Sequence, residues 1–414
     1  MTFTPLHRAL GLAPSPLTDD ILDSAVGAGV KETDDLDWKS ELPPIKNLSQ
    51  GDVPKDIAAM ANSGGGMIIY GVEEDQKSAT RRKSVGELTE IHERAYRSAA
   101  VTAISPPIFG LGVHRLGTDP QAVAVVAPAS VDGPHLVYKN DLFGAPIRND
   151  ADTAWMKERQ IEAMYRARFD ERRRTSDAVD TMYNEAAEGR DSQARAWFVA
   201  VAHPRVPVVL SRPDRHEISA IFERAETVSL SISRNHGVHP LNNMDGLNPR
   251  PGLRRWTAVN KAASEPWKES WADVHHDGSV TVAAALGGHR MNANAYFEGW
   301  QVEGRGLETG VADFAALVRA VSEAQHLDEY EVRVGVVWDG EQPLQVLDVD
   351  GMIRTYVGTS TTLRRFVPIR STINAAGSDE SFHREVFRLA EDCVNQGGIT
   401  SLNIMMEPSI NPED

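Results

Sequence analysis

Six residues near the beginning of the sequence have the types and spacing that cleavage of a phosphodiester bond would need. They are Glu32, Asp37, Lys39, Glu73, Glu74 and Asp75. Carboxylate oxygens can hold Mg²⁺ or Mn²⁺, such a metal ion activates a water molecule, and a lysine offsets the charge of the phosphate. If the segments that carry these acids are neighbouring strands, acids from both segments could meet at one end of the sheet, with Lys39 beside them.

The same acids also have a purely structural interpretation. Charged side chains are almost never buried unless they are paired, so acids at the ends of strands commonly pair with nearby cations at the surface. Spacing alone favours this structural interpretation over a metal site.

A run of cations follows the second group of acids. Arg81, Arg82 and Lys83 lie in a polar segment that predicts a loop, and a second arginine-rich stretch extends from residue 166 to residue 174. Arginine can bind phosphate oxygens through two parallel hydrogen bonds, so residues 81–83 are candidates for contact with nucleic acid. The alternatives are a solvated loop at 81–83 and, for the later arginines, a cationic helix end that complements the helix dipole.

Three consecutive glycines at 64–66 do not predict a phosphate-binding loop. Such a loop runs from a strand through glycines to the amino end of a helix, whose free N–H groups attract the anion. Here a helix expected at 52–62 precedes the glycines, and an apolar strand expected at 67–72 follows them. The pattern therefore predicts a glycine helix cap and a tight turn into the strand, and it gives no support to ATP binding.

Two further segments lead to structural predictions. Adjacent histidines, His275 and His276, would point to opposite faces of a strand, and the following Asp-Gly predicts a hairpin turn rather than a metal site. Cys393 lies on the apolar face of a predicted helix and is expected in the core. Because it is the only cysteine, the chain forms no intramolecular disulfide and no zinc site built from several cysteines.

The elements that position these residues predict an α+β fold. In residues 1–170 we expect a mixed sheet with flanking helices, built from helices at 18–28, 52–62 and 155–168 and strands at 36–42, 67–72, 110–114, 121–129, 134–139 and 143–148. Residues 171–192 are polar and predict a linker helix. Residues 193–414 predict a second α/β domain, with strands at 196–202, 279–286, 331–338 and 343–349 and helices at 215–227, 310–325 and 379–395.

Charge narrows the function classes. The 414 residues carry a formal net charge of −16, which argues against a protein that coats duplex nucleic acid with its whole surface. The charge is uneven, because residues 1–174 carry 21 Lys and Arg against 25 Asp and Glu, whereas the remaining residues carry 22 against 34. Contact with nucleic acid is therefore expected only on a local basic face of the first domain.

No targeting or membrane segment is expected. The first residues lack a basic stretch followed by an apolar core, and the longest apolar runs, such as 123–129, are far shorter than the roughly 20 residues of a membrane helix. We therefore expect a cytoplasmic protein with no membrane partner. The sequence leaves the formation of a homo-oligomer open.

Two longer motifs surround the acids and the glycines. The first is Glu32-Thr33-Asp34-Asp35-Leu36-Asp37-Trp38-Lys39, and the second covers residues 56–75. They resemble two motifs of bacterial Schlafen/AlbA-like (AlbA_2-type) domains. The first family motif is Glu-Ser-x-x-x-Glu-Phe-Lys. The second is a helix that ends in Ala-x-Ala-Asn-x-x-Gly-Gly and is followed by a strand and Gly-Val-x-Asp. Segments 104–107, 128–130 and 145–150 are similar to later landmarks of the same domain. The resemblance spans about residues 18–168 and does not extend to 190–414.

The resemblance implies a DNA- or RNA-binding domain in a protein with a regulatory or defence role. Some members carry a ribonuclease site made of the two acids of the first motif and one acid after the Gly-Val strand. Those positions here are Glu32, Asp37 and one of the acids at 73–75, with Lys39 beside them. The second acid is Asp where the family has Glu, and a Glu pair stands where the family more often has Asp. The candidate nucleic-acid contacts are Lys39, Arg81, Arg82, Lys83 and Arg148.

The leading prediction is accordingly a protein that binds nucleic acid through its first domain. One alternative is an endoribonuclease that depends on Mg²⁺ or Mn²⁺ and cleaves structured RNA such as tRNA. The other is an interaction or sensor protein without nucleic-acid contact, which the net charge of −16 keeps open.

Overall fold

The computed structural model describes residues 4–13, 15–117, 119–139, 142–208, 212–261, 265–350, 355–356 and 361–408. The chain divides into two compact units, Met1–Arg172 and Arg173–Asp414. Both units combine helices with sheets, which confirms the predicted α+β class. Within the described ranges, no helix combines the length and the apolar character that a membrane span requires.

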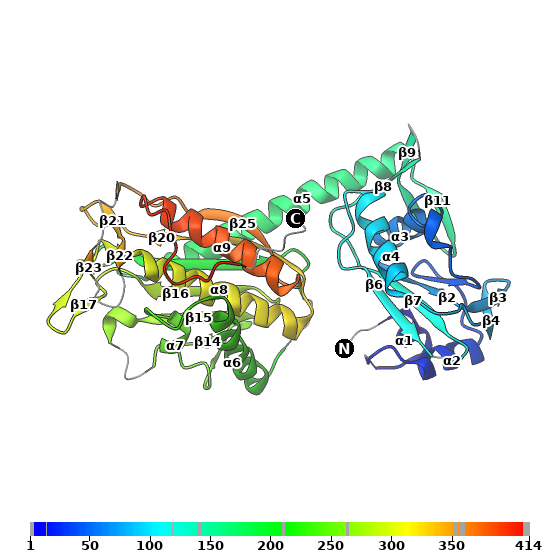
Figure 1. Ribbon diagram of the computed structural model, residues 1–414, viewed down its shortest axis with the longest axis horizontal. Helices are drawn as coiled ribbons and strands as arrows, with labels where there is room; N and C mark the ends of the chain where they lie inside the picture. The colour runs from blue at the N-terminus through cyan, green and yellow to red at the C-terminus, as the bar shows by residue number, and fades with distance from the viewer. Residues whose placement is uncertain are drawn as a thin grey trace. The chain divides into compact units, whose positions relative to one another are not determined.

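The first unit alternates short helices and strands (Figure 1). In chain order they are α1 (Pro5–Leu10), α2 (Asp19–Gly27), β1 (Leu36–Lys39), α3 (Val53–Asn62), β2 (Gly66–Tyr70), β3 (Val72–Asp75), β4 (Ser78–Arg82), α4 (Glu90–Thr102), β5 (Ile104–Ser105), β6 (Gly112–Leu116), β7 (Ala122–Ala127), β8 (Leu136–Lys139), β9 (Leu142–Gly144), β10 (Pro146–Asn149) and β11 (Asp152–Trp155). Helix α5 (Glu158–Ala187) follows and runs past the boundary between the units.

A four-stranded mixed sheet in the order β1-β2-β7-β6 forms the centre of the first unit. Strands β1 and β2 are parallel, so the chain must cross over between them, and α3 makes this crossover. Helices α3 and α4 cover one face of the sheet, where Ile57 and Tyr96 pack on Ile68. Helices α1 and α2 cover the other face, where Leu22 packs with Trp38. Both faces of β1 and β2 are therefore buried.

The three glycines end α3 and turn the chain into β2, as the sequence predicts. Gly64 and Gly65 have φ angles of 95° and 91°, which favour glycine over residues with a Cβ atom. The N–H of Gly65 donates to the carbonyl of Met60 at 2.9 Å. A Cβ atom on Gly65 would lie 2.7 Å from the backbone nitrogen of Ala129, so this turn packs directly on the segment after β7.

The second unit is built on one large sheet. Its elements include β12 (Trp197–Pro204), α6 (Arg215–Ile232), α7 (Pro240–Asn243), β13 (Arg250–Gly252), β14 (Arg255–Ala258), β15 (Ser270–His275), β16 (Val280–Ala285), β17 (Arg290–Asn292), β18 (Ala295–Tyr296), β19 (Gln301–Glu303), α8 (Gly304–Gln325), β20 (Glu329–Val337), β21 (Leu344–Leu347), β22 (Val349–Asp350), β23 (Thr355–Tyr356), β24 (Thr362–Leu363), β25 (Ile369–Asn374) and α9 (Asp379–Asn395). The sheet has the order β13-β14-β15-β16-β12-β20-β25, and every neighbouring pair is antiparallel.

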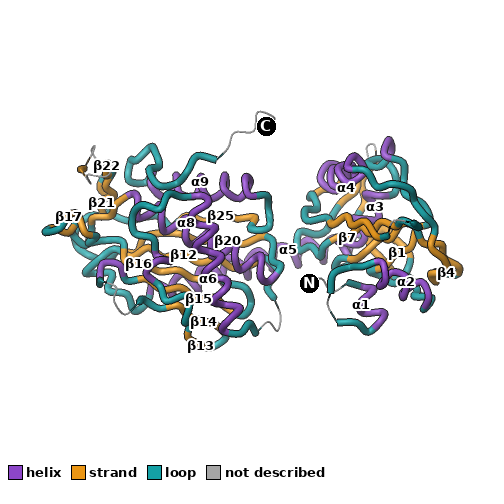
Figure 2. The backbone as a smooth tube through the Cα atoms, turned by 60° about the horizontal axis from the view of Figure 1, so that its bottom comes forward, coloured by secondary structure: helices purple, strands orange, loops and turns teal. Residues whose placement is uncertain are grey.

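Helices cover the two faces of this sheet unequally. Helices α6, α8 and α9 cover one face and close the main core, which includes Phe198 and Cys393 (Figure 2). Cys393 is fully buried there, as predicted. On the opposite face, the part of α5 that belongs to this unit packs through Val179 and Tyr183 on β12 and β16. The predicted hairpin turn after His275 is also present, between β15 and β16.

The structure corrects the helices that were expected from the sequence at the boundary between the units. The sequence predicts a helix at 155–168 and a separate linker helix at 171–192, whereas α5 is one continuous helix from Glu158 to Ala187. The polar residues of its central part caused the predicted break, although a polar segment can remain helical when both of its ends are packed.

Candidate nucleic-acid-binding unit

Strand β1 separates the residues of the first motif onto two faces. Leu36 and Trp38 point into the core beneath α1 and α2. Asp37 and Lys39 alternate with them and pair in register with Ile68 and Tyr70 of β2, which face α3. The strand therefore carries its two charged residues toward the helix of the second motif.

Asp37 is held by two cations. Its Oδ2 lies 2.8 Å from Nζ of Lys39, and its Oδ1 lies 3.3 Å from Nη1 of Arg148 on β10. Arg148 also donates to the carbonyl of Thr33 at 3.1 Å, and its backbone N–H donates to Oγ of Ser63 at 2.9 Å. The side chains of Asp37 and Arg148 are 4 % and 3 % exposed, so this pair is buried.

Asp56 of α3 is a member of the cluster that the sequence analysis did not single out. It is 8 % exposed, and it interacts electrostatically with Lys39 and Asp37. Burial raises the pKa of Asp56 to about 6, with Lys39 opposing the shift and the charge of Asp37 adding to it. Burial alone would lower the pKa of Lys39, but the charges of Asp37, Asp56 and Glu32 more than offset this, and that pKa is raised.

Glu32 precedes β1, and its side chain contacts the backbone of that strand. Its Oε1 accepts the backbone N–H of Trp38 at 2.9 Å. Burial raises the pKa of Glu32 and the Trp38 N–H opposes this shift, whereas the charges of Asp37 and Glu74 add to it. The structure thus brings Glu32, Asp37 and Lys39 together, as expected for a single cluster.

Glu73, the third predicted metal ligand, makes a different contact. The carboxylate of Glu73, on β3, pairs instead with Arg81 of β4 at 2.7 Å. Across the described ranges of the chain, no three histidine, cysteine, aspartate or glutamate side chains are grouped so that they could hold one metal ion. Glu32 is engaged by a backbone N–H, Asp37 by two cations and Glu73 by Arg81, and a metal site made of Glu32, Asp37 and Glu73 stays a prediction.

The five predicted nucleic-acid contacts differ in how far they reach the surface. Arg82 is 8 % exposed and donates to Asp19, Asp23 and the carbonyl of Pro120, and Arg148 is buried against Asp37, so both are held in structural contacts. Arg81 is 73 % exposed and pairs with Glu73. Lys83 is 40 % exposed and pairs with Glu41, and Lys39 is 41 % exposed. The accessible cations are therefore Arg81, Lys83 and Lys39.

Residues 32–157 match the family model described as Schlafen, AlbA_2. Over these residues, the first unit is similar to Schlafen AlbA_2 domains. The two motifs that carry the resemblance in the sequence form the parallel pair β1 and β2 with α3 between them, and the charged cluster lies where these three elements meet.

Similarities to solved structures are weak. The DIP2311 protein from Corynebacterium diphtheriae is 14 % identical with a TM-score of 0.26, and the match covers 50 % of this chain and 34 % of that protein. This chain therefore spans about a third of the length of that protein. The N-terminal domain of a putative ATP-dependent DNA helicase RecG-related protein from Nitrosomonas europaea is 18 % identical with a TM-score of 0.25, and the match covers 34 % of this chain and 94 % of that domain. No curated protein matches the chain.

Proposed function

We propose that the AlbA_2 domain binds nucleic acid, DNA or RNA, and gives this protein a regulatory or defence role. The match of residues 32–157 to the Schlafen AlbA_2 family carries the proposal. The cations on and beside the β3–β4 hairpin supply the contact surface. They are Lys77, Arg81 and Lys83.

Ion pairing does not remove these cations from use. Arg81 pairs with Glu73 and Lys83 pairs with Glu41 at 2.7 and 2.8 Å, and all four side chains are about a third exposed or more. An ion pair at the surface contributes only about 0–1 kcal/mol, because water screens it. A phosphate group can therefore take the place of the carboxylate at low cost, and the release of counterions from the nucleic acid then favours binding.

The experiment measures binding of the full-length protein to labelled single-stranded RNA and to duplex DNA of the same sequence across a salt series. The double variant Arg81→Glu/Lys83→Glu should bind about tenfold more weakly or worse at low salt. The slope of log K against log salt should decrease in magnitude by about 2 on duplex DNA, because each lost phosphate contact removes about 0.9.

Arg94→Glu is the matched control. Arg94 lies on α4, is 77 % exposed and pairs with Glu90, so it resembles Arg81 in type, exposure and pairing but lies on another element. Its reversal should leave binding unchanged. Absence of binding at low salt, or equal losses in the control and the double variant, would refute the proposal.

The geometry gives the ribonuclease alternative no comparable support. Two of its three acids are held in other contacts: Glu32 accepts the N–H of Trp38, and Asp37 is 4 % exposed between Lys39 and Arg148. The proposal is therefore for binding.

A further inference from the structure

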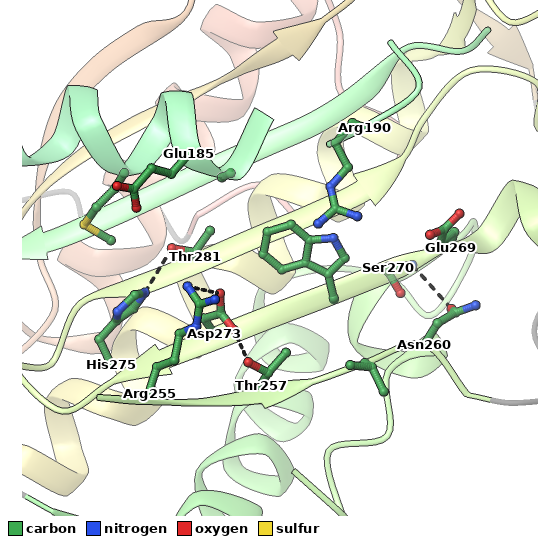
Figure 3. A pocket seen from close by; sticks show the side chains of 14 residues that line it. Glu185, Arg190, Arg255, Thr257, Asn260, Glu269, Ser270, Asp273, His275 and Thr281 are labelled. Atoms are coloured by element: carbon green, nitrogen blue, oxygen red, sulfur yellow. Dashed lines mark hydrogen bonds and ion pairs between the residues drawn. The ribbon is translucent and has the colours of Figure 1, made fainter. Parts of the chain in front are cut away.

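A cavity of about 420 Å³ lies on the half of the large sheet that α5 leaves uncovered (Figure 3). Its floor is formed by β14, β15 and β16, and its wall by the end of α5 and the residues that follow it. The floor carries polar side chains, namely Thr257, Asp273, His275 and Thr281, on a sheet face that would otherwise be apolar. All lining residues belong to the second unit.

Arg190 is fixed in this cavity by two tryptophans. Its Cζ lies 4.0 Å from the ring centroid of Trp271 and 5.5 Å from that of Trp197. Trp197 pairs in register with Ala285 of β16, and Trp271 pairs with Ala283 of the same strand from its other side. A cation stacked in this way keeps its orientation without an ion pair.

The hydrogen-bonding capacity of Arg190 is not used up. Its Nε, like Nε1 of Trp271, is buried and has no hydrogen-bond partner among the described residues. Burial lowers the pKa of Arg190, and the charges of Glu269 and Asp273 only partly oppose this. The guanidinium lines the cavity, and its planar fork is suited to an acceptor that takes two parallel hydrogen bonds, which is the geometry of a carboxylate.

The other charged side chains in the cavity disfavour binding of a ligand that carries only negative charge. The lining includes three acids, Glu185, Glu269 and Asp273, and two arginines, Arg190 and Arg255. Asp273 already accepts from Thr257 and lies 3.5 Å from Arg255, so these two charges offset each other. Burial lowers the pKa of His275, so it adds no positive charge at neutral pH. Glu269 and Glu185 remain, and they favour a ligand that also carries a positive charge.

We propose that this cavity binds a zwitterionic small molecule of the amino-acid type, with its carboxylate on Arg190 and its ammonium group on Glu269. Met182, Ala186 and Val259 give the cavity an apolar wall, which favours an amino acid with an apolar side chain. The proposal concerns the second unit alone, so it goes beyond nucleic-acid binding by the AlbA_2 domain and can fail independently of it.

The experiment is calorimetric titration of the full-length protein with leucine and with two analogues of the same shape. Isocaproate lacks the amine, and isoamylamine lacks the carboxylate. Leucine should bind about tenfold more tightly than either, since each analogue leaves one charged group of the cavity without its partner. Thermal shifts measured with the remaining common amino acids rank the side chains that the cavity prefers. The same measurement with AMP tests whether the cavity binds a nucleotide instead.

Two variants separate binding from folding. Arg190→Met keeps much of the stacked volume and should weaken leucine binding about tenfold or more. Glu269→Gln leaves Arg190 and its stacking in place, and it should weaken binding of leucine but not of isocaproate. Arg384→Ala, on α9 beneath the opposite face, should have no effect. The proposal is overturned if no amino acid binds, if AMP or isocaproate binds as tightly as leucine, or if leucine binding survives both variants unchanged.

Discussion

Replacement of Asp56 by asparagine should stabilise the first unit at neutral pH and remove part of its pH dependence. Asp56 is 8 % exposed on α3, and burial raises its pKa from 3.8 to about 6. The folded state therefore holds this proton more tightly than the unfolded state. Between about pH 4 and pH 6 the free energy of unfolding must fall as the pH rises, because the carboxylate is charged first in the unfolded chain.

The size of the effect follows from the same pKa shift. A difference of about two pH units corresponds to about 3 kcal/mol, at about 1.4 kcal/mol per unit. This value already includes the attraction of Lys39, which keeps Asp37 as a partner at 2.8 Å when Asp56 is neutral. We expect Asp56→Asn to raise the free energy of unfolding by about 3 kcal/mol at about pH 8 and to have little effect at about pH 4.

The assay must distinguish the first unit from the second. Urea unfolding of the full-length protein, followed by pulsed hydrogen exchange and mass spectrometry of peptides from residues 53–70, reports on α3 and β2 alone. Asp52→Asn is the matched control, since Asp52 is 84 % exposed at the start of the same helix and its side chain makes no capping hydrogen bond. Equal stability of Asp56→Asn and the parent at both pH values would refute the assignment of a buried, destabilising charge to this position.

Two further substitutions test buried contacts. Arg148→Met leaves Asp37 with only Lys39 as a partner in a buried site, and urea unfolding should show the first unit destabilised by about 3–5 kcal/mol. Adding Asp37→Asn should recover much of this loss. Glu308 of α8 accepts hydrogen bonds from the N–H groups of residues 403–405, at 3.0, 2.6 and 2.9 Å. Glu308→Ala should therefore lower the free energy of unfolding by about 3 kcal/mol or more and speed hydrogen exchange across that segment. Unchanged exchange at 403–405 would contradict the role given to Glu308.

Much of the first unit could be predicted because its signals are local. The helix before the glycines, the glycine turn and the apolar strand after it are determined by neighbouring residues. The predicted bounds lie within one residue of α3 and within two residues of β2. The same is true of α9, whose apolar face repeats with helical spacing. Helix α4 was missed, since it is mostly polar and only Tyr96, Ala99 and Ala100 are buried.

The charged cluster depends on contacts between distant residues. Arg148 meets Asp37 across 111 positions, and the burial of Asp56 depends on the strand that packs beside α3. Contacts between residues so far apart in the sequence leave no pattern of spacing from which they could be predicted. The loop predicted at 81–83 is wrong for its first two residues, because Arg81 and Arg82 lie on β4, where alternation sends Arg81 outward and Arg82 inward.

The contact between Glu32 and the N–H of Trp38 has a consequence for how copies of this protein behave in concentrated solution. Strand β1 is the edge of its sheet, and an edge strand with free N–H groups is a template on which another chain can add a strand. The carboxylate of Glu32 occupies one of those donors, and Arg148 covers the carbonyl of Thr33 beside it. The acid that most resembles a catalytic residue in the sequence thus protects the domain against strand-mediated self-association.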